Sequence, residues 1–358
     1  MPPKRIGILT GGGDAPGLNA VIRSVVRSAE RLGGFETWGI LDGFEGLLER
    51  RFRPLDRIST RGLVRRGGTV LGTSNRCNPF RFRDPDGSER DRSREVLDNA
   101  REAGLEGLIV IGGDGSLRIA VELVELGLAI VGVPKTIDND LAATDYTFGF
   151  WTAIGTATDA LDRLRDTAES HHRVMLLELM GRDAGWIALC AGIAGAADVI
   201  LIPEIPYRIE AVEATIEGRA AGGQPYSLVV VAEGAVPVDG KPSYVSEDAG
   251  DGHPRHGGAG ERLAQELAPR IEHEIRTTVL GHLQRGGSPV PFDRILATRM
   301  GTAASELASS GRWGRMVCLR GEAICDVPLV ESVARPKLVD PRGDLVASAR
   351  ATGITFGD

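Results

Sequence analysis

Short, mostly apolar segments alternate along this chain with segments whose apolar residues recur every three or four positions. The apolar segments are rich in β-branched residues and span 5–10, 107–111, 129–133, 174–179, 199–202, 227–231 and 277–280. A clear helical pattern begins near Phe148 and places Ile154, Leu161 and Ala168 on one face. Strands that are apolar throughout are typical of a parallel sheet covered by helices on both faces. The alternation therefore predicts an α/β fold.

Length and charge narrow the class of protein. A chain of 358 residues is long enough for about two domains with proper cores. Its formal charge of −7 offers no basic stripe for a nucleic acid, so we expect no nucleic-acid partner. The longest apolar segment, 184–197, falls short of the roughly 20 residues of a membrane span, so we expect no membrane contact. The four cysteines form no C-x-x-C pair and no metal-binding spacing, which favours a cytoplasmic protein with reduced thiols.

Three loops follow apolar segments, at the strand ends where parallel α/β sheets bind their ligands. They are Gly11–Gly17, Gly112–Ser116 and Pro134–Asp140. Glycines let backbone N–H groups approach a phosphate, and the carboxylate of Asp114 is placed to reach Mg²⁺. The third loop offers a lysine, a hydroxyl and two carboxylates, which suit a base for a substrate hydroxyl and the water shell of a metal. Tight turns, or helix starts capped by Asp114 or Ser116, are the structural alternatives.

Two further segments carry arginines at strand ends. Met180–Asp183 contains Arg182, which suits the stabilisation of a phosphoryl group in transfer. His282–Pro289 contains a histidine and Arg285, with Arg276 just upstream, a set that suits the phosphate of a substrate. For Arg182 alone, a solvated side chain at a helix start is an equally good interpretation. A lone histidine is more often structural, and it is the clustering of His282 with Arg276 and Arg285 that favours a phosphate site.

Taken together, these segments resemble the bacterial type of ATP-dependent 6-phosphofructokinase, within the subgroup that mixes ATP- and pyrophosphate-dependent members. The motifs LTGGGDAPGLNAVIR, IGGDGS, PKTIDND, ELMGRDAGWIA and VLGHLQRGGSPVPFDRILATRMG occur in the order and at the spacing of that family and cover nearly the whole chain. The resemblance implies a fold of two similar Rossmann-like domains, each a mostly parallel sheet flanked by helices. It also implies transfer of a phosphoryl group from MgATP to the 1-hydroxyl of fructose 6-phosphate.

The resemblance assigns roles to individual residues. Asp138 is the expected base, and Thr136 and Arg182 are expected to help hold the transferring group. Asp114 and Asp140 are the expected residues of the Mg²⁺ environment. The positions that match ATP contacts are Gly13, Phe44, Arg76, Gly113, Asp114, Gly115 and Ser116. The positions that match sugar-phosphate contacts are Thr136, Asp138, Arg173, Met180, Gly181, Arg182, Glu233, Arg276, His282 and Arg285.

Arg173 and Arg276 match arginines that family members lend to the site of a neighbouring subunit. The resemblance therefore implies a homo-oligomer, a tetramer or a dimer. The family's effector pocket uses arginines that correspond to Arg23, Arg27, Arg57 and Arg165. The turn that completes it with lysines in other members reads Ala-Gly-Gly-Gln-Pro at 221–225, so we expect weak binding of ADP or phosphoenolpyruvate.

Gly115 and Lys135 bear on the phosphoryl donor. Relatives that use pyrophosphate carry aspartate and lysine at these two positions, whereas the bacterial ATP enzymes carry glycine at both. Glycine at 115 leaves room for the α-phosphate of ATP, and a lysine at 135 binds phosphate without excluding a nucleotide, so we predict ATP. The alternatives are a pyrophosphate-dependent enzyme, a kinase for a related ketose phosphate such as sedoheptulose 7-phosphate, and a sugar-phosphate-binding protein without activity.

The same reading predicts the domain boundaries. An ATP-binding domain is expected at 1–145, completed by segments from 265–330, with a sugar-phosphate domain at 146–265 and a C-terminal tail at 331–358. Two segments, 75–95 and 234–260, read as loops because they are rich in Arg and Asp or in Gly and Pro.

Overall fold

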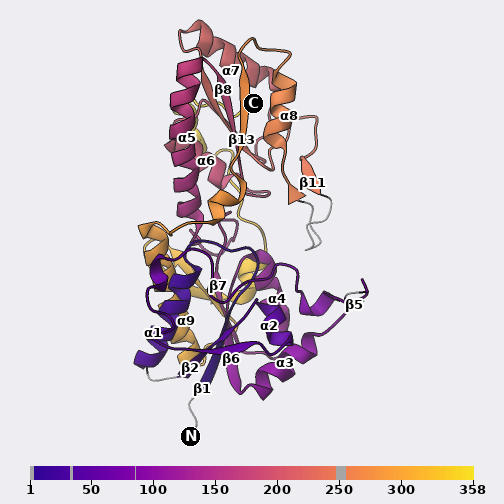
Figure 1. Ribbon diagram of the computed structural model, residues 1–358, viewed down its shortest axis with the longest axis vertical. Coiled ribbons are helices and arrows are strands. Elements are labelled where there is room, and N and C mark those ends of the chain that lie inside the picture. The colour runs from indigo at the N-terminus through magenta and orange to yellow at the C-terminus, as the bar shows by residue number, and fades with distance from the viewer. Residues whose placement is uncertain (1–3, 33–34, 85, 247–254) are drawn as a thin grey trace. The chain divides into compact units, whose positions relative to one another are not determined.

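The computed structural model describes residues 4–32, 35–84, 86–246 and 255–358 (Figure 1). The chain forms two compact units. Unit 1 comprises Met1–Thr136, Leu141–Trp151 and Arg285–Pro336. Unit 2 comprises Ile137–Asp140, Thr152–Gln284 and Lys337–Asp358.

The elements of the described chain follow in order. The strands are β1 (Lys4–Thr10), β2 (Phe35–Ile40), β3 (Phe52–Leu55), β4 (Phe82–Arg83), β5 (Glu89–Arg90), β6 (Leu105–Gly112), β7 (Ile130–Pro134), β8 (Val174–Leu179), β9 (Val199–Leu201), β10 (Ser227–Ala232), β11 (Tyr244–Ser246), β12 (Arg255–His256), β13 (Ile275–Val279), β14 (Arg315–Arg320) and β15 (Ala323–Pro328). The helices are α1 (Leu18–Leu32), α2 (Phe44–Leu48), α3 (Ser93–Glu102), α4 (Asp114–Glu125), α5 (Phe150–His171), α6 (Trp186–Ala194), α7 (Ile209–Ala221), α8 (Ala259–Leu267), α9 (Pro291–Ser309) and α10 (Asp344–Ala351). Short 3₁₀ turns are η1 (Leu63–Arg65), η2 (Pro79–Arg81), η3 (Gly281–Arg285) and η4 (Leu329–Val333).

Unit 1 is built on a seven-stranded sheet in the order β15-β14-β7-β6-β1-β2-β3. The five inner strands are parallel, and β3 and β15 close the two edges in antiparallel pairing. Successive strand residues face opposite layers, as the pleat of a strand requires. Ile109 and Ile111 pack in a cluster with α1 and α9, whereas Leu108 and Val110 pack with α2, α3 and α4. Helices α1 and α9 lie side by side in this unit (Figure 1).

Unit 2 contains a smaller, fully parallel sheet in the order β13-β8-β10-β9. Val174 and Leu176 of β8 pack in one cluster with residues of α7 and α8. Met175, which points the other way, packs against Ala168 of α5. Each unit therefore has a mostly parallel sheet with helices on both faces, and the predicted fold class is confirmed.

Parts of the sequence-based description differ from the structure. Segment 75–95 is not one continuous loop, because it holds η2, β4, β5 and the start of α3. These short elements depend on contacts that a periodic pattern does not reveal: the Asn78 side chain accepts a hydrogen bond from the Phe80 N–H, and Arg92 covers the Phe82 ring. Segment 234–260 contains β11 and β12, and its residues 247–254 lie outside the described residues.

The C-terminal segment packs as part of unit 2. Residues 337–358 belong to unit 2, where Thr355 pairs with Val199 of β9 and helix α10 contacts α6. None of the helices in the described part of the chain is long and apolar enough to cross a membrane.

Candidate functional site

Two of the predicted loops and the start of the third, up to Thr136, meet in unit 1. The strands that precede them, β1, β6 and β7, are parallel neighbours, so their carboxyl ends lie at one edge of the sheet. The Gly11 N–H donates to the Ile111 carbonyl at 2.9 Å, and the Lys135 N–H donates to the Gly112 carbonyl at 2.9 Å. Hydrogen bonds thus link the first loop to the end of β6, and the third loop to the second.

Glycine is required where the first two loops touch. A Cβ atom on Gly11 would lie 2.5 Å from the Ser116 hydroxyl oxygen, and one on Gly112 would clash with the Ser116 Cβ. A larger residue at 11 would push the first loop away from Ser116, and one at 112 would crowd the second loop's own turn into α4. The glycines therefore make room for the Ser116 side chain in the first turn of helix α4.

Helix α4 begins at Asp114, directly after Gly113, and its first N–H groups point away from the helix as anion donors do. The N-cap residue is Gly113, so the capping role considered for Asp114 or Ser116 is wrong. The Asp114 carboxylate is 44% exposed and accepts a hydrogen bond from Arg118 at 2.8 Å. A Cβ on Gly115 would meet nothing within 4 Å, which leaves open space at the start of the helix.

The remaining predicted ATP residues border the first loop. Phe44, the first residue of α2, is buried and lies 3.9 Å from the position of a Gly11 Cβ. The Gly12 N–H donates to the Ser74 carbonyl at 3.1 Å, and Arg76 follows two residues later with an exposed side chain. Both predicted residues therefore belong to segments in contact with the glycine loop.

Two cations brace the first loop from other segments. The Lys135 ammonium is buried and donates to the Gly13 carbonyl. Arg285 donates to the Asp14 carbonyl at 3.2 Å and packs over Gly13. Thr136, also buried, accepts a hydrogen bond on its carbonyl from the Thr147 hydroxyl at 2.7 Å.

The carboxylates of the third loop belong to unit 2. Asp138 is 5% exposed, and the next residue, Asn139, has a φ of 53°, a left-handed conformation that asparagine tolerates. Lys337 donates from its ammonium to the Asn139 amide oxygen at 3.0 Å and from its backbone N–H to the Asp140 carbonyl at 2.7 Å. The C-terminal segment thus holds the loop that carries the predicted base.

Glu233 organises the loop that carries Arg182. Arg182 has a φ of 51°, which is unusual for a residue with a long side chain. The Glu233 carboxylate accepts the N–H groups of Arg182 and Gly181 at 2.9 and 3.2 Å. Burial raises the pKa of Glu233, the N–H donors oppose the rise, and the charge of nearby Asp138 adds to it. Met180, Gly181, Arg182, Glu233 and Asp138 therefore form one cluster in unit 2.

Arg173 and Arg276 are not part of this cluster. Arg173 precedes β8 and Arg276 is the second residue of β13, so both lie at the amino ends of these strands, whereas Met180 follows the carboxyl end of β8. Six strand residues at about 3.3 Å each separate the two ends by roughly 20 Å. Both arginines contact the Glu274 carboxylate, and hydrogen bonding to Arg173 lowers the pKa of Glu274. His282 follows β13 in η3 and is exposed.

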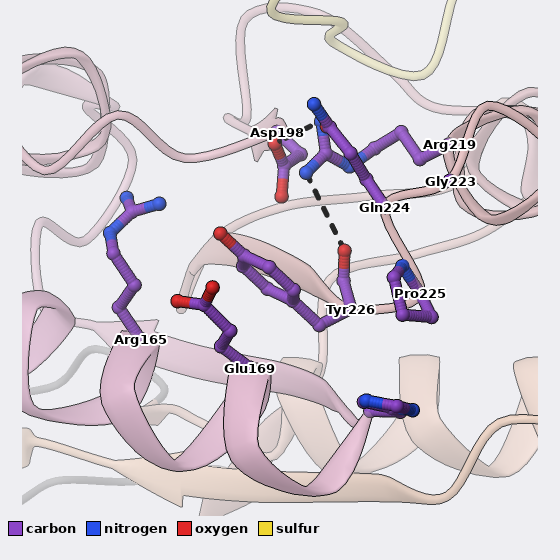
Figure 2. Close-up of a pocket in the computed structure, with 9 residues that line it drawn as sticks. Arg165, Glu169, Asp198, Arg219, Gly223, Gln224, Pro225 and Tyr226 are labelled. Carbon is purple, nitrogen blue, oxygen red and sulfur yellow. Dashed lines mark hydrogen bonds and ion pairs between the residues drawn. The ribbon is translucent and has the colours of Figure 1, made fainter.

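A polar cavity of about 530 Å³ lies elsewhere in unit 2, and Figure 2 shows residues from its lining. Arg165 lines it together with Glu169, Asp198 and residues 223–226. Arg219 donates to Asp198 at 2.8 Å, so one of the cavity's cations is already neutralised. The expected effector arginines Arg23, Arg27 and Arg57 belong to unit 1. The lining carries charges of both signs, and the weak binding of anionic effectors stays a prediction.

Sequence reasoning missed three residues in unit 2. Lys337 supports the Asp138 loop, as described above. Glu204 accepts the N–H groups of Gly185 and Val339 at 2.9 Å and so fixes the start of α6. His256 contacts Asp183, next to Arg182. No local motif marks any of them, because each acts on a segment distant in the sequence.

The donor set suits Mg²⁺. The described residues hold no group of three or more His, Cys, Asp or Glu side chains that could bind a metal alone. Mg²⁺ bound with a nucleotide needs only one or two carboxylates, because phosphates and water complete its octahedron. Asp114, exposed at the start of α4, has the right chemistry for such a ligand.

Comparisons of sequence agree with this geometry. A family model described as phosphofructokinase matches residues 5–308. An "ATP-dependent 6-phosphofructokinase" of Chloroflexus aggregans is 53% identical over 99% of this chain and 98% of its own length. A "Pyrophosphate--fructose 6-phosphate 1-phosphotransferase" of Streptomyces coelicolor is 50% identical over 99% of this chain and 100% of its own length. Overall identity therefore does not separate the two donors.

Comparison of structures gives the same family. Phosphofructokinase from Saccharomyces cerevisiae matches 92% of this chain with a TM-score of 0.75 and 33% identity, and this chain spans 45% of that longer one. A pyrophosphate-dependent phosphofructokinase from Marinobacter aquaeolei matches 96% of this chain and 87% of its own with a TM-score of 0.80. At 24% identity, the second match shows the fold alone.

Proposed function

Since this chain belongs to the phosphofructokinase family, we propose that it transfers the γ-phosphoryl group of MgATP to the 1-hydroxyl of fructose 6-phosphate, a reaction of glycolysis. The products are ADP and fructose 1,6-bisphosphate. The loops of unit 1 that meet at the ends of β1, β6 and β7 supply backbone N–H groups and a helix N-terminus for the nucleotide phosphates.

Asp138 acts as the base in this proposal. It accepts the proton of the sugar 1-hydroxyl while the new O–P bond forms and the bond to ADP breaks. Arg182, held by Glu233, supplies positive charge to the transferring group, and Thr136 contributes to its positioning. Phosphoryl transfer has a loose transition state, so positioning and cations accomplish most of the catalysis.

Asp114 and Asp140 are the residues that would hold Mg²⁺, directly or through its water. The ion would neutralise part of the negative charge of the nucleotide phosphates. Asp114 already faces Arg118 in an exposed ion pair, which costs little to exchange for a metal contact.

The open space at Gly115 is the observation that carries the choice of ATP. A residue with a side chain at the start of α4 would occupy the volume next to the bound phosphates. Lys135 does not oppose a nucleotide, because its ammonium is buried and bonded to the Gly13 carbonyl.

A cytoplasmic location, inferred from the cysteines in the sequence, stays a prediction.

The first test measures the initial rate of fructose 1,6-bisphosphate formation with Mg²⁺ and fructose 6-phosphate, with ATP or pyrophosphate as donor. We expect turnover with ATP and at most a trace with pyrophosphate. Turnover with pyrophosphate in place of ATP would show that Lys135 outweighs Gly115. If neither donor works, sedoheptulose 7-phosphate is the next acceptor, and binding without turnover would favour a protein that has lost its activity.

We further propose a homo-oligomer in which Arg173 and Arg276 serve the site of a neighbouring chain. The roughly 20 Å between them and Met180 excludes their joining the Asp138 cluster of their own unit. Two defective variants should then complement each other. Arg276→Ala lacks the lent arginine and Asp138→Asn lacks the base. A mixed dimer contains one intact site, which takes Asp138 from the first variant chain and Arg276 from the second.

Co-expression of Arg276→Ala with Asp138→Asn under different tags tests this. Random pairing should give an intact site at about a quarter of all positions, so the unfractionated mixture should recover that share of wild-type activity. Arg182→Ala mixed with Asp138→Asn is the matched control, because both residues belong to one unit of the same chain and no hybrid site is intact. Equal activity in the two mixtures would contradict the lending of arginines.

A further inference from the structure

The antiparallel pair of β11 and β12 places a histidine beside the Arg182 loop. Tyr244 of β11 pairs with His256 of β12, and their rings lie 5.0 Å apart. The chain is fixed again directly after this residue, because the Gly258 and Gly260 N–H groups donate to the Glu178 carboxylate of β8 at 3.1 and 2.8 Å. The His256 side chain is only 8% exposed.

His256 contacts the residue that follows Arg182. Its Nε2 lies 3.1 Å from the Asp183 carboxylate oxygen, and since a carboxylate only accepts, Nε2 is the donor. Glu233 holds the same loop from the end of β10, through the Gly181 and Arg182 N–H groups. The loop that carries Arg182 is thus held at two points, by Glu233 and by His256.

The charges of His256 and Glu233 also affect each other. Burial raises the pKa of Glu233, and the charge of a protonated His256 opposes this rise in small part. The second ring nitrogen, Nδ1, is buried and has no hydrogen-bond partner among the described residues. A charged ring donates from Nδ1, and a neutral ring with its hydrogen on Nε2 accepts there, so a hydroxyl group of a ligand could pair with Nδ1 in either state.

We propose that His256 is a positioning residue of the sugar-phosphate site, where it acts through Asp183 to hold the loop of Arg182 in its substrate-binding conformation. This inference rests on the proposed assignment of Arg182 and Glu233 to fructose 6-phosphate. It adds a residue from segment 234–260, in which the sequence showed only a loop. The Arg182 backbone is strained, so a second support has a physical purpose.

Steady-state kinetics of the full-length enzyme test the role. His256→Ala should raise KM for fructose 6-phosphate about tenfold, the usual effect of losing a hydrogen bond to a charged group, while KM for ATP stays unchanged. His256→Gln keeps an N–H donor close to the position of Nε2 and should recover most of the loss. Asp183→Ala should match His256→Ala, and the double variant should be no worse than either, because both remove one contact.

His273→Ala is the matched control. His273 also lies in unit 2 and faces a carboxylate, Glu217 at 3.8 Å, but it is outside the cluster, so both KM values should stay at the wild-type level. The proposal is overturned if His256→Ala leaves KM for fructose 6-phosphate unchanged, raises both KM values alike, or is not distinguished from His256→Gln. Arg182→Ala separates the two levels of inference: if it too leaves that KM unchanged, the assignment of the site itself is wrong.

Discussion

Replacing Asp138 by Asn should lower kcat about 10³-fold, within the range for loss of a general base. The substitution keeps the size of a side chain that is 5% exposed, so the packing of the loop is retained. Asn cannot accept the proton of the sugar hydroxyl at its amide nitrogen, and its neutral oxygen is a poor base. KM for both substrates should stay within a few fold, because binding precedes the proton transfer.

Initial-rate assays measure kcat and KM of the variant, and thermal unfolding of the same preparation checks that it is folded. Asp293→Asn is a matched control, since Asp293 in unit 1 is equally buried but lies in α9 and takes no part in the proposed chemistry. It should keep kcat near the wild-type value even if the folded state loses stability. A fall of less than tenfold for Asp138→Asn, with an intact fold, would show that another group takes the proton.

Gly115→Asp should lower kcat/KM for ATP by about 100-fold or more. The new carboxylate would stand at the start of α4, where the phosphates bind, and two like charges about 4 Å apart at an effective dielectric constant near 20 repel by roughly 4 kcal/mol. The fold accommodates the change, because a Cβ at Gly115 meets nothing within 4 Å. Pyrophosphate, which has no α-phosphate or nucleoside to place there, should lose much less.

The readout is kcat/KM for ATP set against the rate, or the inhibition constant, for pyrophosphate. Gly218→Asp makes the same change at another open helical glycine, in α7 of unit 2, and should alter neither. An equal loss for both donors in Gly115→Asp would mean that the residue affects the loop as a whole and does not choose between ATP and pyrophosphate.

The strands that sequence reasoning found are the ones with a uniform signal. β6 and β8 are apolar at all but one position each, Glu106 and Glu178, because helices cover both faces of the sheet there. It did not find β2, β3, β14 or β15. β3 and β15 are edge strands with several exposed residues, so their sequences lack the pattern of a buried strand.

The sequence identified the predicted site residues through local motifs. The structure shows in which unit, and at which end of a sheet, each of them lies. Gly13 and Gly115 lie with the loops of unit 1, Arg182 and Glu233 in the cluster of unit 2, and Arg276 at the opposite end of its sheet. A motif fixes which chemical groups a loop carries, but not which strands are neighbours. The roles of these residues stay predictions until the variants above are measured.

The sequence alone determined the α/β class, the family, and which chemical groups each loop at a strand end carries. Those properties depend on residues that are close in the chain, where glycines, carboxylates and arginines act within one turn. The tertiary structure decided that Lys337 supports the Asp138 loop, that His256 reaches Asp183, and that Arg173 lies far from the cluster of its own unit. These are contacts or separations between distant segments, and they follow from strand order and packing, which no local pattern records.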